Sequence, residues 1–122
     1  MAKKIGMDEG RAALDAVRAA AAASTRPSRN HQATAVRYLL QLLVEKAPGN
    51  SVEMRVPPFG AVQVVEGPRH TRGTPPNVVE TDAETWIALA TGAEHWTDAA
   101  SAGRIHASGT RSDLSDLLPL RP

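Results

Sequence analysis

The sequence predicts a single α+β domain. Its 122 residues are enough to bury one hydrophobic core and too few for two. Periodic segments occur in the order helices, then strands, then helices around a late strand. No internal repeat is visible, and the irregular alternation of strands and helices argues against a doubly wound parallel sheet.

The first predicted helix covers residues 8–23, DEGRAALDAVRAAAAA. It has acids in its first turn, strong helix formers throughout and a weak apolar side formed by Leu14, Val17 and Ala21. The following STRPSR contains a proline and small polar residues, which is typical of a linker. We therefore divide the chain into an N-terminal helix and linker, residues 1–27, and a domain, residues 28–122. Whether the first helix packs on this domain is left open.

A second helix is predicted from Asn30, a suitable N-cap, through HQATAVRYLLQLLVEKA, and Pro48-Gly49 ends it. Its apolar positions at helical spacing are Val36, Leu40, Leu43, Val44 and Ala47.

Three strands are predicted next. SVEMRV alternates, with Val52, Met54 and Val56 on one face, and the prolines at 57 and 58 end its pairing. AVQVVE is rich in β-branched residues and forms the second strand. The third is short and centred on Val78 and Val79.

The C-terminal part predicts two helices, a strand and a helical turn. Thr81 and Glu84 have capping-box spacing before DAETWIALA, and Gly92 supplies the left-handed C-cap. A short helix around WTDAASA ends at Gly103. RIHAS then alternates, with Ile105 and Ala107 inward and His106 on the polar side. In the last turn, three leucines are expected to align: Leu114, Leu117 and Leu118.

Composition narrows the function. The absence of cysteine excludes disulfides, thiolate metal sites and a cysteine nucleophile, and it favours a cytoplasmic location. No window is apolar enough for stable insertion into a membrane. The net charge is +1, but residues 1–46 carry eight Lys/Arg against four acids, while residues 81–101 carry four acids and no Lys/Arg. With only four aromatic residues, nucleic acid is not expected as a partner.

The segment GPRHTRGTPP, residues 67–76, concentrates positive charge. It is not a phosphate-binding P-loop, because it lacks the lysine and continues into two prolines that cannot donate backbone N–H groups. No acid lies between Gly67 and Val79 to neutralise Arg69 and Arg72. The segment is therefore either an anion-binding site or a solvated, proline-stiffened loop.

No catalytic or metal-binding set emerges. The four histidines, His31, His70, His95 and His106, are scattered without metal-ligand spacing. His95 and Asp98 could pair on a helix, but no nucleophile accompanies them. Trp86 and Trp96 fit either a hydrophobic core or the wall of an apolar cavity, and the sequence alone favours the core.

Residues 77–118 run NVVETDAETWIALATG, WTDAASAG and RIHASG, followed by a leucine-bearing terminal helix. This order resembles the C-terminal half of the sterol carrier protein type-two domain. In that family a strand leads to D-x-x-x-[FWL]-x-x-L-x-x-G, a helix, a G-[KR]-[LI]-x-[IVA]-x-G strand and a final helix that covers an apolar tunnel. Residues 51–120, including RVPPFGAVQVVEGPRHTRGTPPNVVE, are more closely similar to a bacterial branch of small, free-standing sterol-carrier-like proteins.

The resemblance implies a sterol-carrier-like fold: a five-stranded, mainly antiparallel sheet covered by helices, here with an N-terminal helical extension. It also implies a lipid cavity lined at Trp86, Leu89, Trp96, Ile105, Leu114, Leu117 and Leu118. The family binds or transfers acyl chains, sterols and related lipids without chemistry on them, so neither enzymatic activity nor a metal or other cofactor is implied. The arginine-bearing loop and VPPF are not features of the animal carriers, so the ligand is not carried over.

Together these observations favour a non-enzymatic carrier of a lipid-like amphipathic ligand of the fatty acyl or acyl-CoA type. Its tail would meet the apolar set, and its head group would meet Arg69 and Arg72 with Arg55 and His70. The alternative is a protein-interaction module with a filled core and no ligand. A third hypothesis is an enzyme of small anionic metabolites that uses His70 and the arginines. The sequence leaves the oligomeric state open.

Overall fold

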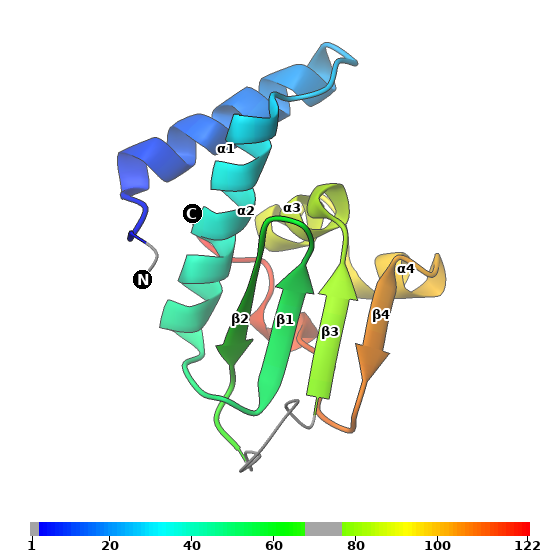
Figure 1. Ribbon diagram of the computed structural model, residues 1–122. Helices are drawn as coiled ribbons and strands as arrows, with labels where there is room; N and C mark the ends of the chain where they lie inside the picture. The colour runs from blue at the N-terminus through cyan, green and yellow to red at the C-terminus, as the bar shows by residue number, and fades with distance from the viewer. Residues whose placement is uncertain (1–2, 68–76) are drawn as a thin grey trace.

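A computed structural model describes residues 3–67 and 77–122 of the chain, which confirm the α+β class (Figure 1). In chain order the elements are α1 (Met7–Ala22), α2 (Arg29–Lys46), β1 (Val52–Val56), β2 (Gly60–Val64), β3 (Asn77–Thr81), α3 (Ala83–Thr91), α4 (Trp96–Ser101), β4 (Ile105–Ser108) and the 3₁₀ turn η1 (Ser115–Leu117). Within residues 3–67 and 77–122, none of the helices combines the length and the hydrophobicity that spanning a membrane requires.

The strands form one mixed sheet in the order β2-β1-β3-β4. β1 pairs antiparallel with β2 and parallel with β3, and β3 pairs antiparallel with β4. The five strands that the resemblance implies are not confirmed, because the described residues form four. Two of the three pairings are antiparallel, as expected.

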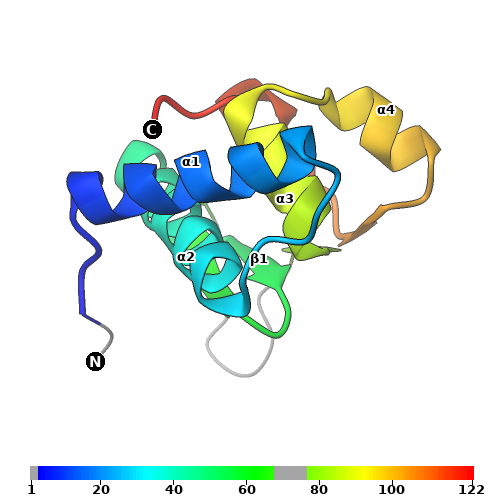
Figure 2. The same cartoon turned by 90° about the horizontal axis from the view of Figure 1, so that it is seen from above.

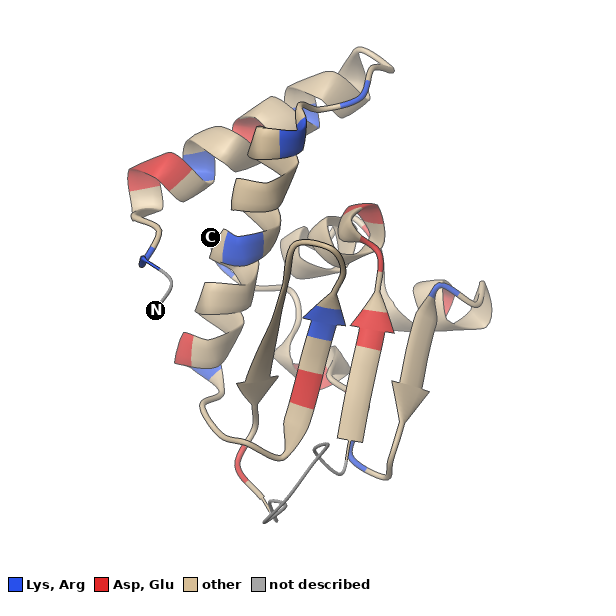
Figure 3. Ribbon diagram, in the orientation of Figure 1, with Lys and Arg blue, Asp and Glu red and all other residues tan. Residues whose placement is uncertain are grey.

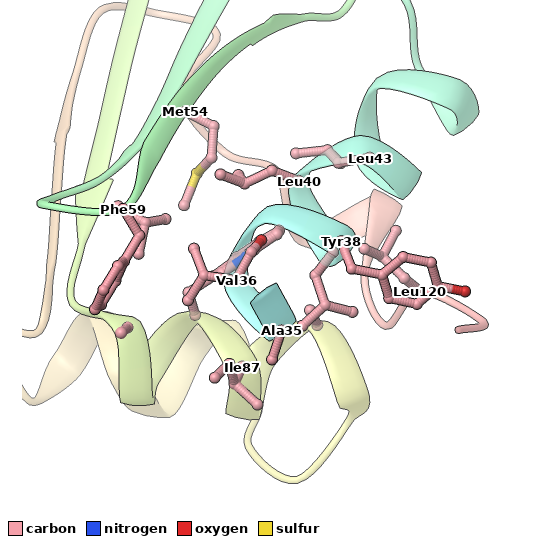
Figure 4. Packing of buried hydrophobic residues seen from close by; sticks show 14 of the residues in the cluster. Ala35, Val36, Tyr38, Leu40, Leu43, Met54, Phe59, Ile87 and Leu120 are labelled. Atoms are coloured by element: carbon pink, nitrogen blue, oxygen red, sulfur yellow. The ribbon is translucent and has the colours of Figure 1, made fainter. Parts of the chain in front are cut away.

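All the helices lie on one side of the sheet (Figure 2). The predicted alternation in β1 is confirmed, because Val52, Met54 and Val56 are fully buried while Glu53 and Arg55 point to the other face. Leu40 of α2 packs toward Met54, and Val36 lies between the sheet and Ile87 of α3 (Figure 4). Side chains thus fill the space between the sheet and its two central helices.

The helix α1 packs on α2, which answers the question of its docking. Gly10 is buried directly against the ring of Tyr38, and a Cβ at this position would lie 2.3 Å from the ring atom Cγ. Ile5, which precedes α1, is hydrogen-bonded to the side-chain amide of Gln41 in α2. The amide oxygen accepts from the N–H of Ile5 at 2.9 Å, and the amide nitrogen donates to its carbonyl at 2.8 Å. The absent side chain at Gly10 therefore allows the two helices to meet closely.

Two predicted helix caps are shifted in the structure. The N-cap of α2 is Ser28 and not Asn30, because the Ser28 hydroxyl accepts from the N–H of His31 at 3.1 Å. The N-cap of α3 is Asp82, whose carboxylate accepts from the N–H of Thr85 at 2.8 Å. Thr81 instead ends β3 and donates its hydroxyl to the carbonyl of Arg104. The predicted left-handed C-cap at Gly92 is confirmed, with φ of 84°.

The late strand β4 is less buried than predicted. Ile105 is half-buried, as its inward position requires, but Ala107 is exposed. The reason is that β4 lies at the end of the sheet, where the short helix α4 packs beside it (Figure 1).

Candidate functional site

A hollow of about 630 Å³ lies where α2 ends beside the strand β2 and the C-terminal segment. Its apolar wall consists of Ala47, Pro48, Val65, Leu114 and Leu117, and its charged residues are Glu66, Arg111 and Asp113. Ligand sites in proteins typically enclose about 300–1,000 Å³ and combine an apolar lining with a few polar groups. The hollow has this size and composition, and we call it the large hollow.

The segment that forms one side of the large hollow is anchored at several points. Lys46 of α2 donates to the carbonyl of Leu117 at 2.7 Å, and the N–H of Leu120 donates to the carbonyl of Ala90 at 2.8 Å. Leu114 is 2% exposed and belongs to the core. The residues after β4 therefore cross the helical side of the molecule and connect α2 with α3.

The three predicted leucines of this segment do not align on one helical face. The helical turn η1 is a single 3₁₀ turn, and Leu118 after it is extended, with φ −113° and ψ 147°. A residue before proline is driven out of the helical region, and Pro119 follows here. Leu114 and Leu117 consequently line the large hollow, whereas Leu118 turns to a second one.

The second hollow, of about 230 Å³, lies between the end of α3, the start of α4 and the C-terminal segment. Leu89, Trp96 and Leu118 contribute its predicted residues, and Glu94, His95 and Thr97 add polar groups. Trp96 is half-buried. The structure thus brings five of the seven family-implied residues to two neighbouring hollows on either side of η1.

Trp86 and Ile105 line neither hollow. Trp86 is fully buried between α2 and α3, where its indole N–H donates to the carbonyl of Val36 at 3.3 Å. Ile105 packs against the margin of the core and pairs with Thr81 across the sheet. Of the two interpretations for Trp86, hydrophobic core and cavity wall, the structure therefore favours the core. That the seven family-implied residues contact a ligand stays a prediction.

Arg111 is a candidate residue that the sequence did not indicate. Its backbone N–H donates to Asn77 Oδ1 at 2.9 Å, and the side chain of Asn77, 3% exposed, also donates to the carbonyl of Ser51. The Arg111 guanidinium reaches Gly67, where a Cβ would lie 2.6 Å from its Nη1. Arg111 is thus held at the large hollow, between the residues at which segment 68–76 leaves and rejoins the described chain.

The large hollow also carries negative charge. Hydrogen bonds from the hydroxyl and the backbone N–H of Ser115 hold the pKa of Asp113 below its ordinary value of 3.8. Glu66 is exposed at the same hollow. Among its described residues, one guanidinium therefore shares the hollow with two carboxylates.

The predicted basic residues are not all near this hollow. Arg55 lies on the face of β1 opposite its buried residues, where it forms an ion pair with Glu53 and adjoins Glu80 of β3. Figure 3 shows charged residues of both signs on β1 and an acidic residue on β3. The helical side carries both hollows, so the sheet separates Arg55 from them. Arg69, His70 and Arg72 fall outside the described residues.

Within residues 3–67 and 77–122, no three His, Asp or Glu side chains gather in a way that could hold a metal ion. An ion pair with two hydrogen bonds joins Arg104 to both carboxylate oxygens of Glu94, at the edge of the smaller hollow. It braces α4 and β4 against the end of α3.

A family model described as "Bacterial SCP ortholog", where SCP denotes sterol carrier protein, matches residues 28–120. This span is more than half of the chain. The chain belongs to this family. A search of the curated proteins gave no match. The matched span of the bacterial SCP family begins at the N-cap of α2, includes both hollows and the whole sheet, and leaves α1 outside.

Proposed function

We propose that this member of the bacterial SCP family binds or transfers a lipid-like amphipathic ligand of the fatty acyl or acyl-CoA type. The observation that carries the proposal is the large hollow, whose volume and apolar wall suit an acyl tail. Each methylene removed from water contributes roughly 0.8 kcal/mol, so the tail dominates the affinity. The cytoplasm is the proposed site of action, since the sequence has no cysteine that would call for an oxidising compartment.

The head group is proposed to meet Arg111, with Arg69, His70 and Arg72 contributing from the segment between Gly67 and Asn77. Arg111 supports this placement because it lies beside both of these flanking residues. The negatively charged carboxylates of Glu66 and Asp113 at the same hollow would repel an anionic head group. Positive charge beyond that of Arg111 is therefore required for anion selectivity, which is the role proposed for Arg69 and Arg72.

The first experiment is native mass spectrometry of the protein purified from a bacterial host, followed by extraction and identification of bound small molecules. A stoichiometric lipid-like adduct that is lost on denaturation supports the carrier. A titration then compares a dansyl-labelled fatty acid with the matching dansyl-labelled fatty alcohol. We expect binding of the fatty acid to weaken by about five- to tenfold in Arg111→Ala, and equally in the double variant Arg69→Ala with Arg72→Ala. Binding of the alcohol should stay unchanged in both. The exposed Arg121→Ala is the matched control; equal losses for acid and alcohol contradict the head-group site.

One observation favours a second function, a protein-interaction module. Side chains from α2, α3 and the sheet fill the interior, and the hollows lie at its margin. An apo mass in the native spectrum, together with no saturable binding of either dansyl probe, would support the module over the carrier.

A further inference from the structure

A third hollow, of about 480 Å³, lies along the strand β2 and shares no residue with the two hollows above. One wall is a single face of α2, formed by Arg37, Leu40, Gln41, Val44 and Glu45. The other wall is formed by Phe59 and the first residues of β2, and Lys3, Lys4 and Ile5 border it. We call it the α2/β2 groove.

The groove runs beside an edge of the sheet. β2 is the terminal strand in the order β2-β1-β3-β4, and within the described part of the chain it pairs only with β1. The outer side of an edge strand presents unpaired N–H and C=O groups to which another extended chain can add. Its exposed residues Ala61 and Gln63 are small or uncharged, so no charged side chain of β2 guards this edge.

The dimensions suit a short extended peptide. From Arg37 to Glu45 the helix face rises about 12 Å at 1.5 Å per residue. An extended chain advances about 3.3 Å per residue, so four to five peptide residues span the groove. At one end the strand approaches the helix closely, because a Cβ at Gly60 would lie 3.2 Å from Leu40 Cδ1.

The charge of the groove is positive at both ends and apolar between them. Arg37 donates its Nε to the carbonyl of Phe59 at 2.8 Å, and no described residue bonds its two terminal nitrogens. At the other end, Lys4 Nζ lies 3.3 Å from Oε1 of the exposed Glu45, and Lys3 adds a further positive charge. Three cations thus face one carboxylate. The centre is formed by Leu40 and by the half-buried Ile5, Val44 and Val62.

We propose that the α2/β2 groove binds an extended peptide of a partner protein by strand addition to β2, with the pattern acid-x-apolar-x-acid. Alternate residues of a strand point to the same face. The first, third and fifth side chains therefore face α2: the acids meet Arg37 and Lys4, and the apolar residue meets Leu40 and Val62. This site is independent of the proposed lipid function, since it uses neither hollow beside η1.

Two observations favour a peptide over other occupants. A lipid would use the apolar centre and the cations but would leave the outer backbone groups of β2 without a strand partner. A second copy of β2, with the sequence GAVQV, has no carboxylate to offer Arg37 or Lys4.

The probe is a fluorescein-labelled peptide, Asp-Thr-Val-Thr-Asp with blocked ends, titrated by fluorescence polarisation against the full chain. We expect saturable binding that the peptide Lys-Thr-Val-Thr-Lys does not show. Two further peptides are N-methylated either at both threonines or at the valine and the second aspartate. Strand addition predicts that one of them loses binding and the other retains it, because N–H groups of alternate residues point to opposite sides. Equal binding of both N-methylated peptides would overturn the proposal.

On the protein, Lys4→Glu should weaken the Asp peptide by about fivefold at low salt, because it reverses an exposed charge at the groove. Arg26→Glu makes the same change of net charge at an exposed site outside the groove and should have no effect. Hydrogen exchange should show new protection of amides in β2. No saturable binding up to about 1 mM, equal binding of the Asp and Lys peptides, or protection of β2 by self-association alone would each refute the proposal.

Discussion

Trp86 donates its indole N–H to the backbone carbonyl of Val36 at 3.3 Å, and both side chains are fully buried. This contact fastens α3 to the middle of α2. It uses the only polar atom of the indole ring inside an otherwise apolar cluster.

Replacement of Trp86 should therefore cost stability. Trp86→Phe leaves unfilled volume and removes the donor, and it should lower the free energy of unfolding by about 1–3 kcal/mol; Trp86→Ala should lower it by about 3–5 kcal/mol. Urea denaturation followed by circular dichroism measures both. Trp96→Phe, at the half-buried wall of the smaller hollow, is the matched control and should cost less than about 1 kcal/mol. If Trp86→Phe were as mild as Trp96→Phe, Trp86 would not be a core residue.

The contact between Gly10 and Tyr38 gives a second prediction. Alanine is favoured over glycine inside a helix by about 1 kcal/mol, so propensity alone would make Gly10→Ala stabilising. The new methyl would overlap the Tyr38 ring, however, and we expect α1 to be displaced from α2. Hydrogen exchange should show faster exchange in α1.

The same variant tests the proposed division of the chain at residues 27 and 28. If residues 28–122 form a domain by themselves, amides of the sheet should keep their protection in Gly10→Ala. Ala12→Gly, on the exposed side of α1, is the control that lowers helix propensity without touching Tyr38. Loss of protection throughout the sheet would instead make α1 an integral part of the fold.

The ion pair of Glu94 with Arg104 predicts a dependence of stability on pH. The hydrogen bond from Arg104 lowers the pKa of Glu94 from its ordinary value of 4.5. Because the folded pKa is the lower one, the pair stabilises the fold above pH 4.5, and this contribution is lost as the pH falls through the folded value. Glu94→Gln should thus have a lower melting temperature than the parent protein at neutral pH. In acid the two melting temperatures should approach each other.

Melting temperatures measured from neutral pH down to about pH 3 would show this convergence. Asp116→Asn, an exposed carboxylate of η1 with no described ion pair, is the control and should follow the parent curve. A constant difference between Glu94→Gln and the parent at every pH would contradict an ionic origin.

The separation of Leu117 from Leu118 allows the two hollows to be distinguished. If the acyl tail occupies the large hollow, Leu117→Ser should weaken a dansyl-labelled fatty acid by about tenfold, because several buried carbon contacts are lost. Leu118→Ser faces the smaller hollow and should leave affinity within about twofold. The reverse order would move the tail to the hollow beside Trp96.

Much of the fold could be predicted because its signals are local. The alternation of Val52, Met54 and Val56 requires only one buried face, and Gly92 is needed where a helix ends in the left-handed conformation. The N-caps of α2 and α3 lie one or two residues away from their predicted positions, because several nearby side chains can accept a hydrogen bond from a free N–H at a helix start. Ser28 and Asn30 both have suitable side chains, but the helix already begins at Arg29, so Ser28 is the residue that caps it.

The candidate site was harder to predict because its parts are brought together only by the tertiary fold. Arg111 gains its position from Asn77, which is far away in the sequence. The three leucines match helical spacing, yet the turn ends before Leu118 because proline follows it. For Arg55, the alternation of β1 already placed it opposite the buried face, but only the position of the helices shows that both hollows lie across the sheet.

The parallel pairing of β1 with β3 has a consequence for how the chain folds. On one side of this seam, α2 and the β1–β2 hairpin are contiguous in the sequence, and on the other side β3, α3, α4 and β4 are contiguous. The β1–β2 pairing joins residues 4 to 12 apart in the sequence, whereas the seam joins residues 25 apart and the β3–β4 pairing joins residues 24 to 30 apart. Because loop closure costs more for longer loops, the hairpin is the local unit of the sheet, and the sheet becomes continuous only when β3 and β4 close their longer loops.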